Sequence, residues 1–284
     1  MAPQNVIAVI FDFDDTLTDE STTKLLEAHG MDPREFWGIR QSELIRAGWD
    51  PAIAYLKLML DETAEGKPLV GLSNKTLREF GAKLEFYQGI PELFDELHAL
   101  AREHRSSNPV VEFYIVSSGL EEIIRGTKYA HYFTEIWGCR FSEEKGRISQ
   151  IMNSVSFTEK TKFIYAINKG FLDVRTNPYR VNEAVIQSDR RVPFQNMIYI
   201  GDGLTDVPCF SLLDHFGGKA FGVFDPRKQD SPKKAWEKLV VPKRVSTMNS
   251  PKYGKQDDLG ALLRMAVQTV CTHLDLKTQT ALGG

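Results

Sequence analysis

Acidic residues are concentrated in one short stretch near the N-terminus, DFDDTLTDE at positions 12–20. Carboxylates that are crowded together raise one another's pKa and cost stability unless a cation compensates them. The stretch, which begins with Asp12 and Asp14, therefore predicts a cation site. Taken alone, the stretch could instead be the start of a helix. A helix cap formed by an acid, Thr16 or Thr18 would need only one or two of these residues.

A second segment of small polar residues, Ser117-Ser118-Gly119, lies between an apolar run and the helix-like sequence EEIIRG. At a strand-to-helix turn, such residues expose backbone N–H groups and an O–H donor at a helix N-terminus, where anions bind. An ordinary helix cap is the alternative reading of this segment.

Two aspartates, Asp202 and Asp206, lie in the segment GDGLTD, again directly after an apolar run. The glycines permit a tight turn, and aspartates four residues apart can face one ion from a loop and the start of a helix. Alone the segment reads as a common turn, whereas together with the first acidic stretch it predicts a cation site. Between the first acidic stretch and this segment, the sequence TEKTK contains Lys160 and Lys162, either of which could compensate the carboxylates. Most lysines at helix starts, however, are merely solvated.

Unbroken apolar runs predict the strands that position these residues, at 6–11, 113–116, 197–200 and 220–224. Such runs are typical of strands covered on both faces. Helical patterns separate them, for example at 91–104, and alternating strands and helices indicate a parallel α/β sheet. Because ligands bind at the carboxyl ends of parallel strands, we expect the polar segments to meet at one edge.

The segment between the first strand and the helix at 91 reads as helices only. It is far longer than the ~2–6 residues of an ordinary strand-to-helix connection. We therefore assign residues 20–85 to a helical cap inserted after the first strand, and residues 1–19 and 86–284 to the α/β core.

Taken together, the four polar segments resemble the motifs of the haloacid dehalogenase superfamily in their order along the chain. D-x-D-x-T-L corresponds to Asp12–Leu17, the strand-end serine to Ser117, the lysine to Lys160 and G-D-x-x-x-D to Gly201–Asp206. Within the superfamily, the chain looks most like the phosphoserine-phosphatase-like branch. The resemblance implies a Rossmann-like parallel sheet with a C1-type cap.

The resemblance also implies catalytic roles. Asp12 corresponds to the nucleophile that forms an aspartyl-phosphate, and Asp14 to the general acid and base. The implied cofactor is Mg²⁺, held by the Asp12 carboxylate, the Asp14 carbonyl and Asp202, with Asp206 acting less directly or through water.

The phosphoryl oxygens would be held by Ser117, Ser118, Gly119 and Lys160. We choose Lys160 over Lys162 because it lies at the expected helix start, and two residues on a helix point about 200° apart. Lys162, beside Phe163, is expected to face solvent.

We therefore predict a Mg²⁺-dependent phosphatase that hydrolyses a small-molecule phosphate monoester. Asp14 favours ester hydrolysis, because family members that break carbon–halogen or carbon–phosphorus bonds lack this second aspartate. A phosphomutase of the same superfamily and a catalytically idle binding scaffold are the alternatives.

The sequence gives two observations that bear on the substrate. Phosphoserine enzymes of the family carry a glutamate nine residues after the nucleophile, where this chain has Ser21, with Glu20 one position earlier. Aromatic and cationic cap residues could line the site or belong to the cap's own core and surface: Trp37, Arg40, Arg46, Trp49 and Tyr55.

The composition of the chain argues against several other classes of protein. The 284 residues are 42% hydrophobic and 26% charged, with a net charge of −3, so no overall field favours nucleic acid or an acidic membrane. The three cysteines form no metal or disulfide pattern, and no segment resembles a signal peptide or membrane span. We expect a cytoplasmic protein whose last residues, KTQTALGG, fray.

Overall fold

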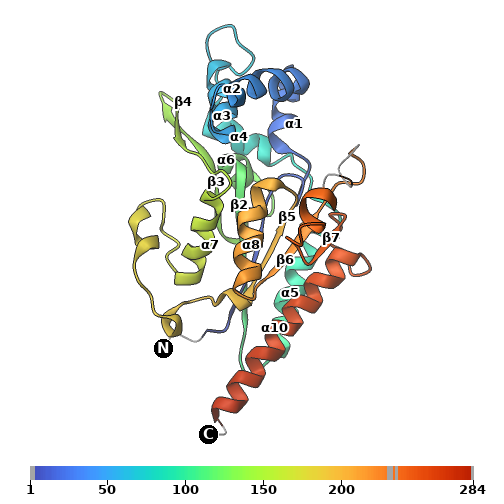
Figure 1. Ribbon diagram of the computed structural model, residues 1–284. Helices are drawn as coiled ribbons and strands as arrows, with labels where there is room; N and C mark the ends of the chain where they lie inside the picture. Colours follow the sequence, from blue (N-terminus) through green and yellow to red (C-terminus); the bar gives the residue numbers. More distant parts are fainter. Residues whose placement is uncertain (1–3, 229–232, 234–235, 283–284) are drawn as a thin grey trace.

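The computed structural model describes residues 4–228, 233 and 236–282. Its centre is a seven-stranded sheet in the order β4-β3-β2-β1-β5-β6-β7, drawn in Figure 1. All neighbouring strands are parallel except β3 and β4. The strands are β1 (Val6–Phe11), β2 (Val110–Leu120), β3 (Phe133–Glu144), β4 (Arg147–Asn153), β5 (Met197–Gly201), β6 (Lys219–Val223) and β7 (Thr247–Asn249).

Helices cover both faces of the sheet, as the packing of two aromatic residues demonstrates. Phe11 of β1 pairs with Ile200 of β5 in parallel register, so the preceding residue, Tyr199, faces the opposite side. Phe11 packs edge-on against Phe94 of α5 (Glu92–Glu103), with ring centroids 6.0 Å apart. Tyr199 packs against Phe210 of α8 (Val207–His215) at 5.6 Å.

Each face carries a second helix beside the first. Helix α7 (Glu159–Lys169) contacts α8, and the long helix α10 (Asp258–Leu282) contacts α5. This double covering explains the strand sequences: all six residues of β1 and all five of β5 are buried.

The chain between β1 and α5 forms a separate group of helices above the carboxyl end of β1 in Figure 1. Its two connections to the sheet run side by side, since Thr18 pairs with Phe86 and the Tyr87 amide donates to the Leu17 carbonyl at 2.9 Å. We refer to this group as the inserted helices: α1 (Ser21–Ala28), the wide-turned η1 (Arg34–Gln41), α2 (Ser42–Arg46), α3 (Pro51–Asp61) and α4 (Asn74–Gly81).

The structure corrects the sequence analysis at several elements. Strands β3, β4 and β7 were not predicted, and β4 makes the sheet mixed. Strand β2 continues to Leu120 instead of ending at Val116. Residues 277–282, expected to fray, continue α10. Within the described residues, no helix is long and apolar enough to cross a membrane.

Candidate active site

The carboxyl ends of the central strands bring the predicted segments together. Asp12 directly follows β1, Ser117 lies near the end of β2, and Asp202 directly follows β5. Because β1 lies between β2 and β5, these three positions are neighbours at one edge of the sheet. The expectation that the polar segments meet at the strand ends agrees with this arrangement.

A buried ion triad forms the floor of the site. The ammonium of Lys160, at the start of α7, lies 2.9 Å from Asp12 Oδ2 and 2.6 Å from Asp206 Oδ1. Lys160 and Asp206 are fully buried, and Asp12 is 5% exposed. The two carboxylates raise the pKa of Lys160 against the opposing effect of burial, so the lysine stays charged. Lys160 therefore compensates two carboxylates that are largely removed from water, one fully buried and one at the base of the site.

Lys162 lies in a different environment. Its ammonium pairs with Glu159 and lies 4.8 Å from the Phe163 ring centroid. Of the two candidate lysines, the structure therefore brings Lys160 to Asp12 and directs Lys162 elsewhere.

The Asp12 side chain has few places to move. Its Oδ1 accepts a hydrogen bond from the Phe13 amide at 2.7 Å, while Oδ2 contacts Lys160. Burial raises the pKa of Asp12 to about 7, Asp206 adds to the rise, and Lys160 opposes it. The protein thus holds this carboxylate in a fixed orientation in a poorly hydrated place.

Asp14 lies beside the end of β2. Its Oδ1 accepts from the Ser21 amide at 2.7 Å, and burial, followed by the Glu20 carboxylate, raises its pKa to about 7. Its Oδ2 lies so close to Gly119 that a Cβ built there would be 2.3 Å from this oxygen. A side chain at position 119 would therefore push the Asp14 carboxylate out of its present place.

The Ser117-Ser118-Gly119 segment is an irregularity in β2 rather than the turn that was expected. Val116 pairs with Trp137 and Leu120 with Cys139, so β2 carries two extra residues here. The Gly119 amide donates to Ser117 Oγ at 2.9 Å. Ser118 Oγ is buried and has no hydrogen-bond partner within the described residues.

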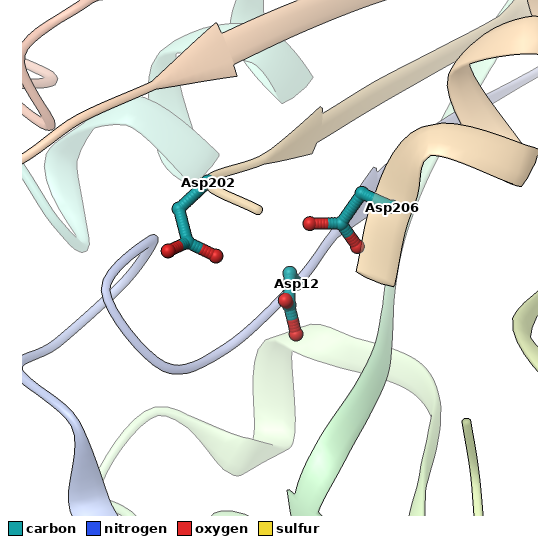
Figure 2. A group of neighbouring side chains, drawn as sticks. All are labelled: Asp12, Asp202 and Asp206. Carbon is teal, nitrogen blue, oxygen red and sulfur yellow. The ribbon is translucent and has the colours of Figure 1, made fainter. Parts of the chain in front are cut away.

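Three carboxylates converge beside this segment. Figure 2 shows Asp12, Asp202 and Asp206 extending from the end of β1, the end of β5 and the chain at the start of α8. One carboxylate oxygen from each lies within 4.8 Å of the others. Burial, followed by the charges of Asp12 and Asp206, raises the pKa of Asp202 well above its ordinary value.

The donor set suits a hard divalent cation, because carboxylate oxygens are the ligands that Mg²⁺ prefers. The aspartates differ in how many hydrogen bonds their carboxylates already accept from the protein. Asp206 Oδ1 accepts from Lys160 and Tyr199, and Oδ2 accepts from the Gly203 amide at 3.2 Å. Asp202 accepts no hydrogen bond from any described residue, so it has the most free lone pairs.

A cavity of about 220 Å³ opens above these groups. Its lining comes from the acidic stretch, the end of β2, the segment after β5 and the inserted helices: Asp12, Asp14, Asp15, Glu20, Thr22, Trp37, Tyr55, Ser117, Ser118, Gly119, Asp202 and Thr205. Five of these residues are acids, and none of the described lining residues is a lysine or arginine.

The inserted helices contribute aromatic residues to the cavity but not the cations considered from the sequence. Trp37 and Tyr55 line it, with ring centroids 5.7 Å apart. Arg40 instead pairs with buried Glu62 at 2.6 Å, and Arg46 donates to the Ser42 carbonyl of its own helix at 3.2 Å.

Trp49 is 39% exposed and lies outside the lining. Glu20 does reach the cavity, but its carboxylate also caps α1 by accepting from the Thr22 and Thr23 amides.

Two contributors from outside the predicted polar segments were missed from the sequence. Tyr199 donates to Asp206 Oδ1 at 2.7 Å, yet it lies inside a strand where an aromatic residue reads as core. Thr22 lines the cavity from the first turn of α1. The alternation of faces along β5 could have placed Tyr199 beside α8, but not its hydroxyl on Asp206.

A comparison with known protein families covers the part of the chain that contains this site. A family model described as haloacid dehalogenase-like hydrolase matches residues 9–211, which include every predicted site residue. The chain belongs to this family. The predicted superfamily is thereby confirmed, and the chain is a hydrolase of the haloacid dehalogenase type by membership.

A relative from Borreliella burgdorferi, described as an uncharacterized protein, is 33% identical over 236 residues, covering 75% of this chain and 80% of its own length.

Solved structures share the α/β fold. A probable phosphoserine phosphatase from Vibrio cholerae matches with a TM-score of 0.57 and 14% identity, over 97% of this chain and 68% of its own. A haloacid dehalogenase family hydrolase from Salmonella enterica serovar Typhi gives 0.55 and 16%, over 93% and 72%. A substrate-bound phosphoserine phosphatase gives 0.54 and 13%, over 91% and 97%. At these identities the likeness establishes the fold, and it confirms the predicted fold class.

Proposed function

We propose that the protein is a Mg²⁺-dependent phosphatase that hydrolyses a small-molecule phosphate monoester through an aspartyl-phosphate on Asp12. The observation that carries the proposal is the buried triad, in which Lys160 fixes Asp12 at the floor of a cavity that also holds Asp14. A protein that only binds its ligand would not need a general acid such as Asp14 in the same poorly hydrated cavity as Asp12, whose carboxylate is held by Lys160.

In the first step, a carboxylate oxygen of Asp12 attacks phosphorus and the ester oxygen leaves. The leaving oxygen takes a proton from Asp14, whose pKa of about 7 allows a substantial protonated fraction near neutral pH. In the second step, Asp14 accepts a proton from water as the water attacks phosphorus. Asp12 is thereby released as a carboxylate together with inorganic phosphate.

The phosphoryl oxygens would be held by Ser117, Ser118, Gly119 and Lys160. The unpartnered hydroxyl of Ser118 supports this assignment, since a buried donor without a partner is costly unless a ligand accepts from it. The pairing of β2 with β3 is interrupted over residues 117–119, so the backbone here is not committed to regular pairing with β3.

Magnesium would be held by the Asp12 and Asp202 carboxylates and the Asp14 carbonyl, with Asp206 acting less directly, and when bound it would neutralise charge on the phosphoryl group. The acidic lining supports this part of the proposal. A phosphate dianion is repelled by those of the five acidic side chains that are ionised, unless a cation offsets them.

The inserted helices, with the boundaries 20–85, would act as the cap that excludes water and selects the leaving group. The cavity of about 220 Å³ is smaller than the ~300–1,000 Å³ typical of pockets for drug-sized ligands, which favours a small substrate. We place the enzyme in the cytoplasm, and the three buried free thiols are consistent with a reducing compartment.

A screen of phosphate release tests the proposal. The panel contains sugar phosphates, phospho-amino acids, nucleotides, lipid head-group phosphates and p-nitrophenyl phosphate, each with Mg²⁺ and with EDTA. We expect Mg²⁺-dependent release from at least one small monoester and none from Asp12→Asn. Phosphoryl transfer to a sugar phosphate without release would indicate a mutase, and no reaction in any arm would refute the proposal.

A further inference from the structure

We propose that Tyr55, on helix α3 of the inserted helices, is a positioning residue that orients the peptide between Ser118 and Gly119. The inference rests on the proposed function, because it concerns the segment that would hold the phosphoryl group. It assigns to the inserted helices a part in building that segment, in addition to covering it.

The Ser118–Gly119 peptide is held from both sides. On one side, the Tyr55 hydroxyl donates to the Ser118 carbonyl at 2.8 Å, and the Cys139 thiol donates to the same oxygen at 3.2 Å. On the other side, the Gly119 amide donates to Ser117 Oγ at 2.9 Å. In a planar trans peptide the C=O and N–H point in opposite directions, so a contact that fixes one also fixes the other.

This stretch of backbone needs such contacts because the sheet does not supply them. The pairing of β2 with β3 stops at Val116 and resumes at Leu120, which leaves residues 117–119 outside the regular ladder. Glycine at position 119 adds conformational freedom. Without the contacts to the Ser118 carbonyl, the hydrogen bond from the Gly119 amide to Ser117 Oγ would be the remaining hydrogen bond among the described residues that opposes rotation of this peptide.

The orientation matters for the chemistry of Ser117. Because Ser117 Oγ accepts from the Gly119 amide, the hydroxyl hydrogen of Ser117 remains free to point at a phosphoryl oxygen. A rotated peptide would turn the Ser118 carbonyl toward Ser117 Oγ. The Ser117 hydroxyl would then donate to this carbonyl instead of to a phosphoryl oxygen. The rotation would also bring a carbonyl oxygen toward the Asp14 carboxylate, which already lies against Gly119.

Tyr55 is suited to this task. Tyr55 is 5% exposed, and burial raises the pKa of the phenol well above its ordinary value, so the hydroxyl remains a donor. Its ring packs against Trp37, and this contact does not involve the hydroxyl. Removing the oxygen alone therefore leaves the packing of the inserted helices in place.

Tyr55→Phe tests the inference, with Tyr132→Phe as the matched control. The Tyr132 hydroxyl donates to Asp95 at 3.1 Å in a solvent-exposed hydrogen bond, and Tyr132 lies outside the cavity lining. Calorimetry measures the affinity of each variant for inorganic phosphate with Mg²⁺ present. Hydrogen exchange followed by mass spectrometry reports the amides of residues 117–120.

We expect Tyr55→Phe to bind phosphate about three- to tenfold more weakly, the effect of one lost hydrogen bond, and to exchange these amides faster. The thermal midpoint of Tyr55→Phe should fall by only about 2–4 °C, the effect of one lost hydrogen bond, and Tyr132→Phe should bind phosphate and exchange these amides as the wild type does. This comparison separates positioning from general stability. In an active wild type, kcat/KM for p-nitrophenyl phosphate should fall by the same factor.

Wild-type phosphate affinity in Tyr55→Phe overturns the inference, whatever its exchange rate. Because affinity and exchange are measured without turnover, a wild type that hydrolyses no ester refutes only the proposed function.

Discussion

Replacing Lys160 with methionine should destabilise the protein by about 3–5 kcal/mol, the usual cost of breaking a buried ion pair from one side. Lys160 Nζ lies 2.9 Å from Asp12 and 2.6 Å from Asp206. At an effective dielectric constant near 20, charges about 3 Å apart attract by about 5.5 kcal/mol, and desolvation offsets part of each attraction. Since domains are stable by only about 5–15 kcal/mol, the variant should melt roughly 6–20 °C lower.

The loss should also grow with pH. Burial raises the pKa of Asp12 to about 7 in the wild type even though Lys160 opposes the rise, so removing Lys160 moves this pKa higher. A carboxyl whose pKa is raised on folding contributes stability at low pH that is lost as pH rises through its folded pKa. In the variant this loss continues above pH 7, by up to about 1.4 kcal/mol per pH unit.

Urea unfolding in EDTA measures both effects, because no divalent cation then compensates the carboxylates. Between about pH 7 and about pH 8.5 we expect the gap between Lys160→Met and the wild type to widen by about 2 kcal/mol. Lys162→Met is the control and should stay within about 0.5 kcal/mol of the wild type. A loss under about 1 kcal/mol, or a gap that does not change with pH, would refute the reasoning.

Three further predictions concern catalysis and metal binding. Asp14→Asn should lower kcat by about 10²–10⁴, and less with p-nitrophenyl phosphate than with an alkyl phosphate, so equal losses would contradict the acid role. Gly119→Ala should lower activity on alkyl phosphates without unfolding the protein, because the new Cβ would lie 2.3 Å from Asp14 Oδ2 and displace it. Wild-type activity in this variant would show that Asp14 can adapt. Asp202→Asn should raise the Mg²⁺ concentration for half-maximal activity more than tenfold, and Asp206→Asn less. Asp206 accepts hydrogen bonds from Lys160, Tyr199 and the Gly203 amide, whereas Asp202 accepts none from the described residues; the reverse order would contradict this assignment.

The positions of Asp12 and Asp202 could be predicted because each follows a strand buried on both faces, and an unbroken apolar run identifies such a strand. Strand β3 was missed because its sequence mixes buried with exposed polar residues and contains Gly138, so it lacks that run. The irregularity at residues 117–119 was also missed, since it arises from the register between β2 and β3.

Side-chain partners within the inserted helices could not be predicted either. Arg40 had the chemistry to face the cavity, but Glu62, 22 positions away, pairs with it instead. A helical pattern predicts which residues share a face and leaves open which charged residue of another helix lies opposite. The choice of Lys160 rested on the resemblance to the family's lysine motif, the expected helix start and the directions of the two side chains, and it agrees with the contacts of Lys160 to Asp12 and Asp206.

The central claim is that Asp12 forms a covalent bond to phosphorus. Acid quenching during turnover, borohydride reduction and peptide mapping test it most directly, because borohydride converts an aspartyl phosphate to homoserine. We predict homoserine at position 12 in the wild type and none in Asp12→Asn. Phosphate release by the wild type with no modification at position 12, or with the modification on another residue, would contradict the account.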